Sequence, residues 1–254
     1  LHGIDAPMYY VALMTFVLIF SSVTMVLAVD AGHHMNKAKV TFYMLLTIIG
    51  GLIFVGSQAW EWKNFIKGEY GALETRGGQI LQFLNIETGK RAAIQEFSIG
   101  IDSERSAHQS YNGIWYKDET TRPSVSVDEV KKGFLANQSL VIRTEQITES
   151  GQKTILSRDD SLVKIEEAID VVEGANLIHN EYGNRLFADF FFFITGFHGF
   201  HVFSGVVINV IIFFNVILGT YERRGHYEMV EKVGLYWHFV DLVWVFVFTF
   251  FYLV

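Results

Sequence analysis

Four long apolar segments constrain this 254-residue chain more than any other feature. They run over about Tyr9–Val29, Val40–Trp60, Leu186–Leu218 and Val233–Val254. A helix rises about 1.5 Å per residue, so roughly 20 apolar residues cross the hydrocarbon core of a bilayer. Because lipid offers the main chain no hydrogen-bond partner, each segment is predicted to cross as an α-helix. The expected fold class is an all-α transmembrane helix bundle with four spanning helices and an inserted extramembrane domain.

The inserted domain is predicted from a polar block between the second and third apolar segments. Residues 64–184 contain 13 Lys/Arg and 19 Asp/Glu, which is most of the charge of the chain. Alternating runs at Ser139–Arg143 and Thr154–Leu156 predict half-buried strands, whereas Ser161–Val172 has the apolar spacing of a short helix. About 120 residues suffice for a small folded domain, which we expect to be α+β or β-rich. Its predicted core positions are Ile86, Ile94, Phe97, Ile99, Ile114, Trp115, Leu140, Ile142 and Leu156.

Three parts are therefore expected along the chain. Residues 1–63 carry the first two spanning helices, residues 64–184 form the inserted domain, and residues 185–254 carry the last two helices. No basic region precedes a short apolar stretch at the start, so we expect no signal peptide.

Charge and cysteine content exclude several functional classes. The net charge of −7 and the lack of a basic patch argue against nucleic-acid binding. The chain has no cysteine, which excludes disulfides, thiolate metal sites and cysteine nucleophiles.

Positive charge in the two short turns predicts the orientation. Both turns lie on one side of a four-crossing chain, and the positive-inside rule makes that side cytoplasmic. Residues 64–184 are then predicted to be periplasmic. The basic residues that support this orientation are Lys37, Lys39, Arg223, Arg224 and Lys232.

Two histidines interrupt the third apolar segment. His198 and His201 lie three residues apart, so they share a helix face, and imidazoles are costly against lipid. The simpler expectation for each histidine is a hydrogen bond to a neighbouring main-chain carbonyl or a position among headgroups. The sharper alternatives are a haem ligand, a metal ligand or a contact to a lipid phosphate. Gly196, Gly199 and Gly205 favour close helix packing over a slot for haem.

The second and fourth apolar segments carry polar groups as well. His238 and Asp241 are again three residues apart, and a hydrogen-bonded pair would reduce the cost of burying either group. This pair is predicted to hold the fourth helix against its neighbours; a proton relay is the alternative. Trp237 is either a core residue or an interface anchor. Glu61 is predicted to lie in the headgroup layer or to contact a nearby helix or a partner.

Four short strings resemble subunit III of the haem–copper cytochrome c oxidases. Thr195–Val202, followed by Gly205, is similar to the penultimate helix of that family, and Tyr236–Trp244 is similar to its last helix. Ala31–His34 and Gln58–Trp62 resemble the preceding helical pair in order and spacing. The resemblance covers about residues 1–62 and 185–254. Members have seven or five helices, of which this chain would supply the last four, and most have a short loop in place of residues 64–184.

The resemblance implies a function without redox chemistry in this chain. It implies no catalytic residue, no metal ligand and no bound haem or copper; haem and copper are expected in partner subunits. The chain would pack on catalytic subunit I and other oxidase subunits, bind phospholipid, and support proton uptake and sustained turnover during oxygen reduction. The expected location is the bacterial inner membrane, with cytochrome c or a respiratory supercomplex partner contacting residues 64–184. The residues expected to bind lipid or pack helices are His198, His201, His238, Asp241, Glu61 and Trp237.

Two rival functions remain at this point. A small b-type membrane cytochrome would use His198 or His201 with His238 as axial ligands, although these residues are expected at different depths. A permease with a periplasmic domain is the second rival, but such chains usually place the large domain after the first helix.

Overall fold

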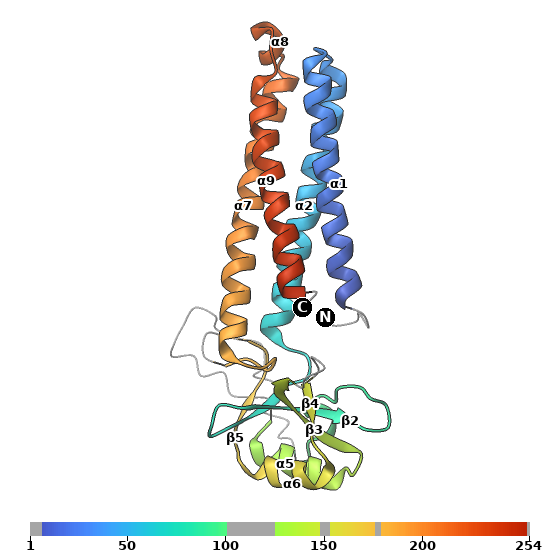
Figure 1. The fold of residues 1–254 in the computed structure, drawn as a ribbon, viewed down its shortest axis with the longest axis vertical. Coiled ribbons are helices and arrows are strands. Elements are labelled where there is room, and N and C mark those ends of the chain that lie inside the picture. The colour runs from blue at the N-terminus through green and yellow to red at the C-terminus, as the bar shows by residue number, and fades with distance from the viewer. Residues whose placement is uncertain (1–6, 101–124, 148–152, 176–178, 253–254) are drawn as a thin grey trace. The chain divides into compact units, whose positions relative to one another are not determined.

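Helices dominate the fold of this chain (Figure 1). The computed structural model describes residues 7–100, 125–147, 153–175 and 179–252. These residues form two compact units. One unit joins the described residues up to Trp62 with those from Phe191 onward, and the other is Lys63–Phe190.

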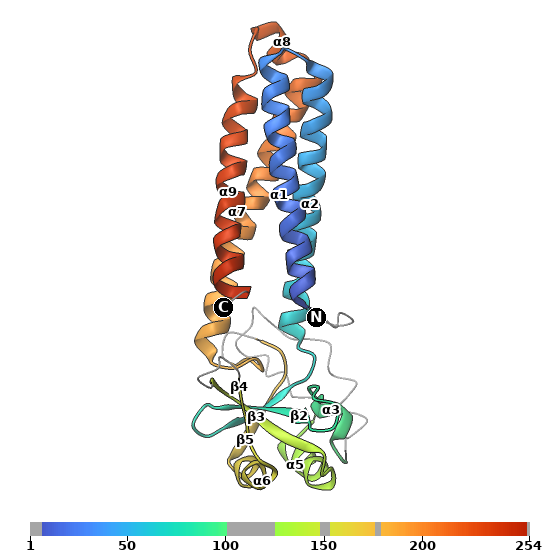
Figure 2. The same cartoon turned by 45° about the vertical axis from the view of Figure 1, so that its right-hand side comes forward.

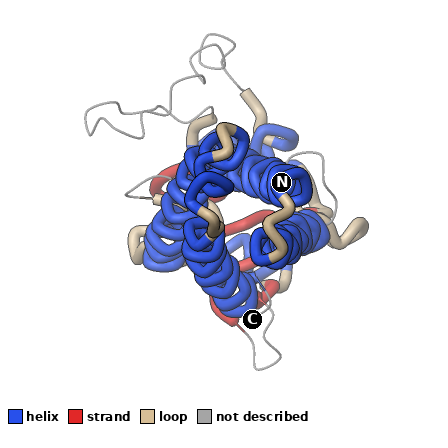
Figure 3. The backbone as a smooth tube through the Cα atoms, turned by 90° about the horizontal axis from the view of Figure 1, so that it is seen from above, coloured by secondary structure: helices blue, strands red, loops and turns tan. Residues whose placement is uncertain are grey.

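Four helices are long and apolar enough to cross a membrane: α1 (Pro7–His33), α2 (Lys37–Lys67), α7 (Arg185–Ile217) and α9 (Glu228–Tyr252). They run side by side in both side views (Figures 1 and 2) and are seen nearly end-on in Figure 3. The predicted four-helix transmembrane fold is confirmed, and the chain is a multi-pass membrane protein. The last turn of α2 and the first residues of α7 belong to the second unit.

The two basic turns lie at the same end of the bundle, as predicted. The turn between α1 and α2 and the short helix α8 (Thr220–Arg224) stand together in Figures 1 and 2. Lys37 pairs with Glu222 at 3.3 Å, and His33 lies 3.7 Å from Glu231. Contacts between exposed charges of this kind contribute little stability. They nevertheless place the two turns side by side.

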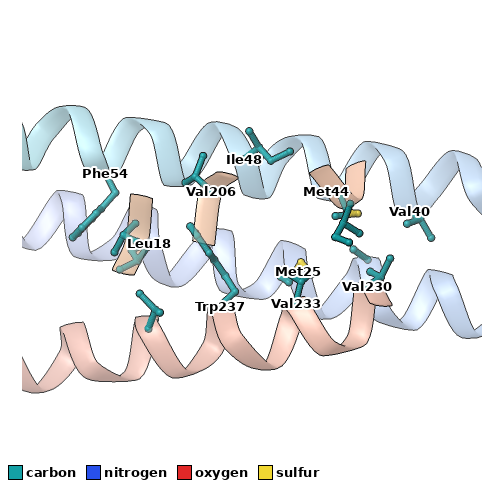
Figure 4. Close-up of a cluster of buried hydrophobic side chains, with 14 of the residues drawn as sticks. Leu18, Met25, Val40, Met44, Ile48, Phe54, Val206, Val230, Val233 and Trp237 are labelled. Atoms are coloured by element: carbon teal, nitrogen blue, oxygen red, sulfur yellow. The ribbon is translucent and has the colours of Figure 1, made fainter. Parts of the chain in front are cut away.

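The core of the bundle is a continuous apolar cluster drawn from all four long helices. Figure 4 shows part of it, where Trp237 of α9 lies beside Val206 of α7. Gly51 of α2 permits this packing, since a Cβ there would lie 2.6 Å from the Trp237 ring. Phe193, Phe197 and Phe200 of α7 point outward and are exposed. An apolar outer surface of this kind suits lipid or a partner helix.

The second unit is built on an antiparallel sheet of five strands in the order β4-β3-β2-β1-β5. The strands are β1 (Ala72–Thr75), β2 (Ile80–Asn85), β3 (Leu140–Ile147), β4 (Lys153–Ile155) and β5 (Ala168–Val172). Helices α3 (Ile94–Phe97), α5 (Val127–Ala136) and α6 (Arg158–Glu166) complete the described part. The strand-containing insert predicted from the polar block is confirmed.

One face of this sheet packs against helices α5 and α6. On β2 and β3 the residues of this face are every second one, Leu81 and Phe83 on β2 and Leu140 and Ile142 on β3. Phe83 of β2 and Phe134 of α5 have ring centroids 5.5 Å apart. Helix α5 begins with a capping box between Ser126 and Glu129, which fixes its first turn. The core on this face includes Leu73, Leu81, Phe83, Ile94, Val130, Phe134, Leu140, Ile142 and Ile165.

Two predictions about the insert are wrong. Ser161–Val172 is not one helix: α6 ends at Glu166, and Ala168–Val172 forms β5 by pairing with β1. Ile86 and Ile99 were expected in the core, yet about half of each side chain is exposed, 56% and 50%. Ile86 follows the end of β2 and Ile99 follows the end of α3, so neither lies on a packed face.

The other predicted core positions divide into two groups. Leu140, Ile142 and Ile94 are buried, and Phe97 and Leu156 pack partly against the same cluster. Ile114 and Trp115 lie outside the described residues.

The carboxylate of Glu181 is buried between the segment that precedes β1 and the segment that follows β5. Glu181 is fully buried, and its two carboxylate oxygens accept hydrogen bonds from four main-chain N–H groups at 2.8–3.3 Å. Ionised carboxylates that accept main-chain N–H groups form strong hydrogen bonds. The carboxylate therefore ties the segment after β5 to the segment before β1. The four donors are Glu69, Tyr70, Gly71 and Gly174.

Candidate functional site

Three tryptophans of the bundle donate to hydroxyl groups on neighbouring helices. Trp244 Nε1 donates to Thr15 Oγ1 at 2.9 Å, Trp237 Nε1 donates to Ser21 Oγ at 3.1 Å, and Trp62 Nε1 donates to Thr195 Oγ1 at 3.1 Å.

Each hydroxyl in turn donates to a carbonyl of its own helix. The acceptors are the carbonyls of Val11, Leu18 and Phe191, at 2.8, 2.6 and 2.6 Å. An indole N–H left without an acceptor in hydrocarbon is costly, so these relays help specify how the helices face one another.

His198 lies in the bundle interior, only 3% exposed. Its Nε2 is 3.0 Å from the main-chain oxygen of Val240 on α9. The ring packs between Phe54 and Trp244, at centroid distances of 5.8 and 5.0 Å. This matches the simpler expectation of a histidine bonded to a neighbouring carbonyl. Its Nδ1 is buried and has no hydrogen-bond partner among the described residues.

His201 occupies a different environment, although it shares a helix with His198. Its Nδ1 is 2.7 Å from the carbonyl of Phe197, one turn back on the same helix. The ring contacts Phe197 and Phe200 at 4.6 and 5.8 Å, and both phenylalanines face outward. The two histidines therefore do not form one site.

His238 and Asp241 meet a residue of α1 rather than one another. Ser22 Oγ lies 2.6 Å from His238 Nδ1 and also bonds the carboxyl group of Asp241. Asp241 was expected to face the bundle and bond a neighbour, with His238 or a residue of α7 as the partner. It does bond a neighbour, but that neighbour is Ser22, because α1 packs directly on α9. Asp241 Oδ1 is buried and has no partner in the described part of the chain.

Glu61 is buried in the bundle, 4% exposed. One oxygen accepts from Gln58 Nε2 at 2.8 Å, and the other accepts from Tyr252 Oη at 3.0 Å. The carboxylate therefore links the end of α2 to the end of α9, which agrees with contact to a nearby helix rather than a position among headgroups. Trp237 is 1% exposed and is a core residue.

The arrangement supports helix packing better than redox chemistry. His198 Nε2 faces a carbonyl and His238 Nδ1 faces a hydroxyl, so these two imidazoles do not face each other as axial haem ligands would. Among the described residues there is no group of three or more His, Asp or Glu side chains placed to hold a metal ion. The sequence reasoning missed Thr15, Ser21, Ser22 and Thr195, whose only signal was a hydroxyl inside an apolar segment.

Comparison with known proteins shows which family part of this chain resembles. The family model described as cytochrome c oxidase subunit III matches residues 168–254. A cytochrome c oxidase subunit 3 of Thermostichus vulcanus is 40% identical over 82 residues, which cover 28% of this chain and 37% of the relative. A Synechocystis cytochrome c oxidase subunit 3 is 33% identical over 128 residues, 46% of this chain and 54% of the relative.

A third relative gives the same picture over a shorter stretch. The probable cytochrome c oxidase subunit 3 of Rickettsia conorii is 41% identical over 75 residues, 29% of this chain and 26% of the relative. The chain therefore spans between about a quarter and a half of the length of these three curated relatives. The family match contains the whole of α7 and α9, with His198, Trp237, His238 and Asp241. Residues 168–254 are thus the part of this chain that is similar to cytochrome c oxidase subunit III.

Proposed function

We propose that this chain acts as a non-redox, integral-membrane subunit III of a respiratory cytochrome c oxidase. In this role it packs on the catalytic subunit, binds phospholipid, and supports proton uptake and sustained turnover during oxygen reduction. Haem and copper reside in partner subunits.

One observation carries the proposal: the family match falls on the helices whose polar groups are used in packing. His198 bonds a carbonyl of α9, and Trp237 and Trp244 donate to hydroxyls of α1. Polar residues satisfied within a bundle stabilise a scaffold, whereas the outward phenylalanines of α7 leave an apolar surface for lipid or a partner helix.

Isolation of the complex tests this function. An affinity tag on the chain should recover a haem- and copper-containing complex from native membranes, and mass spectrometry of that complex should show this chain with a catalytic subunit. After dissociation, the isolated chain should carry no stoichiometric haem by pyridine haemochrome assay. A stoichiometric haem in the isolated chain would instead favour the b-type cytochrome.

Asp241→Leu separates a packing role from a proton-transfer role. It removes the carboxyl group that bonds Ser22 and is expected to lower the amount of chain retained in the purified complex. Turnover per intact complex should be unchanged. Complete retention with lost turnover would contradict a packing role for Asp241. Thr249→Val is a suitable control, since Thr249 is a partly exposed residue of α9 that bonds only carbonyls of its own helix among the described residues.

The insert is proposed to lie on the periplasmic side and to contact another oxidase subunit or a cytochrome c domain. Its support is the basic composition of the two turns at the opposite end of the helices, together with an excess of acidic over basic residues in 64–184. Replacing residues 68–184 with a short Gly/Ser linker should leave the complex assembled but slow electron donation at low salt. Unchanged donor kinetics in the assembled complex would remove the docking role.

A further inference from the structure

Three basic side chains converge on the sheet face opposite helices α5 and α6. Gln82 of β2 pairs with Arg143 of β3, so their side chains lie on the same face. Lys153 of β4 reaches the same point, with Nζ 3.5 Å from Gln82 Oε1. The backbone bridge between Leu84 and Arg91 brings Arg91 to this face as well.

Arg143 and Gln82 form the centre of this cluster. Arg143 Nε and Nη2 donate to Gln82 Oε1 at 3.1 and 2.7 Å. Lys153 Nζ donates to the carbonyl of Tyr182 at 2.5 Å. The amide oxygen of Gln82 and the carbonyl oxygen of Tyr182 are neutral, so these bonds position the basic side chains without pairing them with a negative charge.

Arg91 is the residue whose contacts are incomplete. Its guanidinium lies over the ring of Tyr70, 4.4 Å from the centroid. Its Nε and Nη2 are buried and have no hydrogen-bond partner among the described residues. Glu181 is close enough to act on Arg91 electrostatically, but its oxygens already accept four main-chain N–H groups. A buried guanidinium with unused donors is unfavourable unless an acceptor is supplied.

The positive charges of Arg91 and Arg143 also repel one another. Burial lowers the pKa of Arg91, and burial together with the charge of Arg91 lowers the pKa of Arg143. Among the described residues, neither guanidinium forms an ion pair with a carboxylate. An anion between them would therefore relieve both their repulsion and the unused donors.

Contacts inside the same unit place this cluster beside the last turn of α2. The ring of Tyr182 stacks on Phe65 with centroids 3.9 Å apart, and Tyr182 Oη donates to the carbonyl of Phe65 at 3.0 Å. Lys153 bonds the carbonyl of that tyrosine. Phe65 belongs to the last turn of α2, a helix long enough to span a membrane, and the phosphate groups of lipids lie near the ends of spanning helices.

We propose that Arg91 and Arg143 bind a phosphate group, supplied by a phospholipid headgroup or by free phosphate. A guanidinium presents paired N–H donors that match phosphate oxygens, and Arg91 has two such donors unused. Lys153 adds a third positive charge beside them. The site lies in the insert and is independent of the proposed oxidase function.

The test uses the full chain in a phosphate-free detergent such as dodecyl maltoside. One arm adds phosphatidylglycerol and counts retained lipid by native mass spectrometry. The other arm adds inorganic phosphate and follows its ³¹P NMR linewidth. The double variant Arg91→Gln/Arg143→Gln should bind the effective probe at least about tenfold more weakly. Lys132→Gln, an exposed lysine on α5 over the opposite sheet face, should bind like the original chain.

The possible outcomes distinguish a headgroup site, a free-phosphate site and the absence of a phosphate site. Lipid retained in the presence of excess inorganic phosphate supports a headgroup site, whereas lipid displaced by phosphate supports a free-phosphate site. Equal binding of both probes by the original chain and the double variant overturns the proposal. If the double variant does not fold, Arg143→Lys retains the charge but loses the guanidinium fork; it should weaken binding several-fold, and unchanged binding there would also overturn the proposal.

Discussion

The membrane bundle and the sheet unit (Lys63–Phe190) differ in how they satisfy several of their buried polar groups, although the bundle also buries the carboxyl group of Glu61. The bundle uses neutral relays, in which an indole N–H donates to a hydroxyl that donates to a carbonyl of its own helix. The sheet unit uses the carboxylate of Glu181 to bind four main-chain N–H groups. Charge is costly where lipid surrounds the fold and cheaper in a unit with an aqueous surface. The same need for hydrogen bonds therefore produces different chemistry in the two regions.

The largest effect should come from removing that carboxylate. Glu181→Ala leaves four buried N–H groups without their charged acceptor, and we expect the sheet unit to lose more than about 3 kcal/mol of stability. Hydrogen-exchange mass spectrometry of the full chain should show lost protection in peptides containing Gly71 and Gly174. Glu87→Ala, in an exposed turn, serves as the control. If peptides of α1 and α9 lost protection equally, the two regions would not be separate stability units.

A smaller loss of stability is expected from adding a side chain at Gly174, where the segment after β5 contacts the last turn of α2. Gly174 has φ of +69°, and a Cβ there would lie 2.0 Å from the carbonyl oxygen of Ile66. Gly174→Ala should cost about 2–3 kcal/mol from strain and overlap together. Gly89→Ala is a matched control, because its φ is +65° but nothing lies within 4 Å of the added atom. Similar exchange protection in the two variants would mean that the close approach to Ile66 does not contribute.

The corresponding test in the bundle uses glycines of α2. A Cβ at Gly51 would lie 2.6 Å from the ring of Trp237 and 2.7 Å from Val206, so Gly51→Ala should destabilise the bundle by about 1–2 kcal/mol. Gly56→Ala adds a methyl group to open space on the same helix and should be neutral or slightly stabilising. Thermal unfolding in detergent, followed by tryptophan fluorescence, compares them. A more stable Gly51→Ala variant would show that Trp237 is less tightly packed than the structure indicates.

The smallest effect concerns a single relay. Thr15→Val removes the acceptor of Trp244, and we expect a loss of about 1 kcal/mol, since hydrogen bonds between membrane helices average about 0.6 kcal/mol. Trp244→Phe and the double variant complete a cycle that isolates the coupling between the two side chains. A coupling above about 3 kcal/mol, comparable to the Glu181 effect, would remove the distinction between neutral relays and the charged clamp.

The helices were predictable because segment length and apolar content are local properties of the sequence. Strand β5 was not, since Ile165 and Ile169 have helical spacing and only pairing with the distant β1 decides the conformation. The buried polar contacts were only partly predictable. His198 bonds a carbonyl, which was one of the alternatives predicted from the sequence. The partner of His238 is Ser22 of α1, and nothing in the sequence near His238 indicates it. Glu181 is one of 19 acidic residues in the insert, and nothing adjacent in sequence distinguishes it.

The close contact between Gly68 and Gly174 explains how a hairpin of membrane helices tolerates an insert of this length. A Cβ on Gly68 would lie 2.3 Å from the nitrogen of Gly174, so chain segments more than 100 residues apart meet at the base of the sheet unit. The entropy lost in closing a loop grows with the number of free residues. Because the segments that begin and end the sheet are in contact with each other, the unit adds little to the effective length of the connection between α2 and α7. Insertions of this kind can be acquired, enlarged or exchanged with little thermodynamic consequence for the helices that carry them.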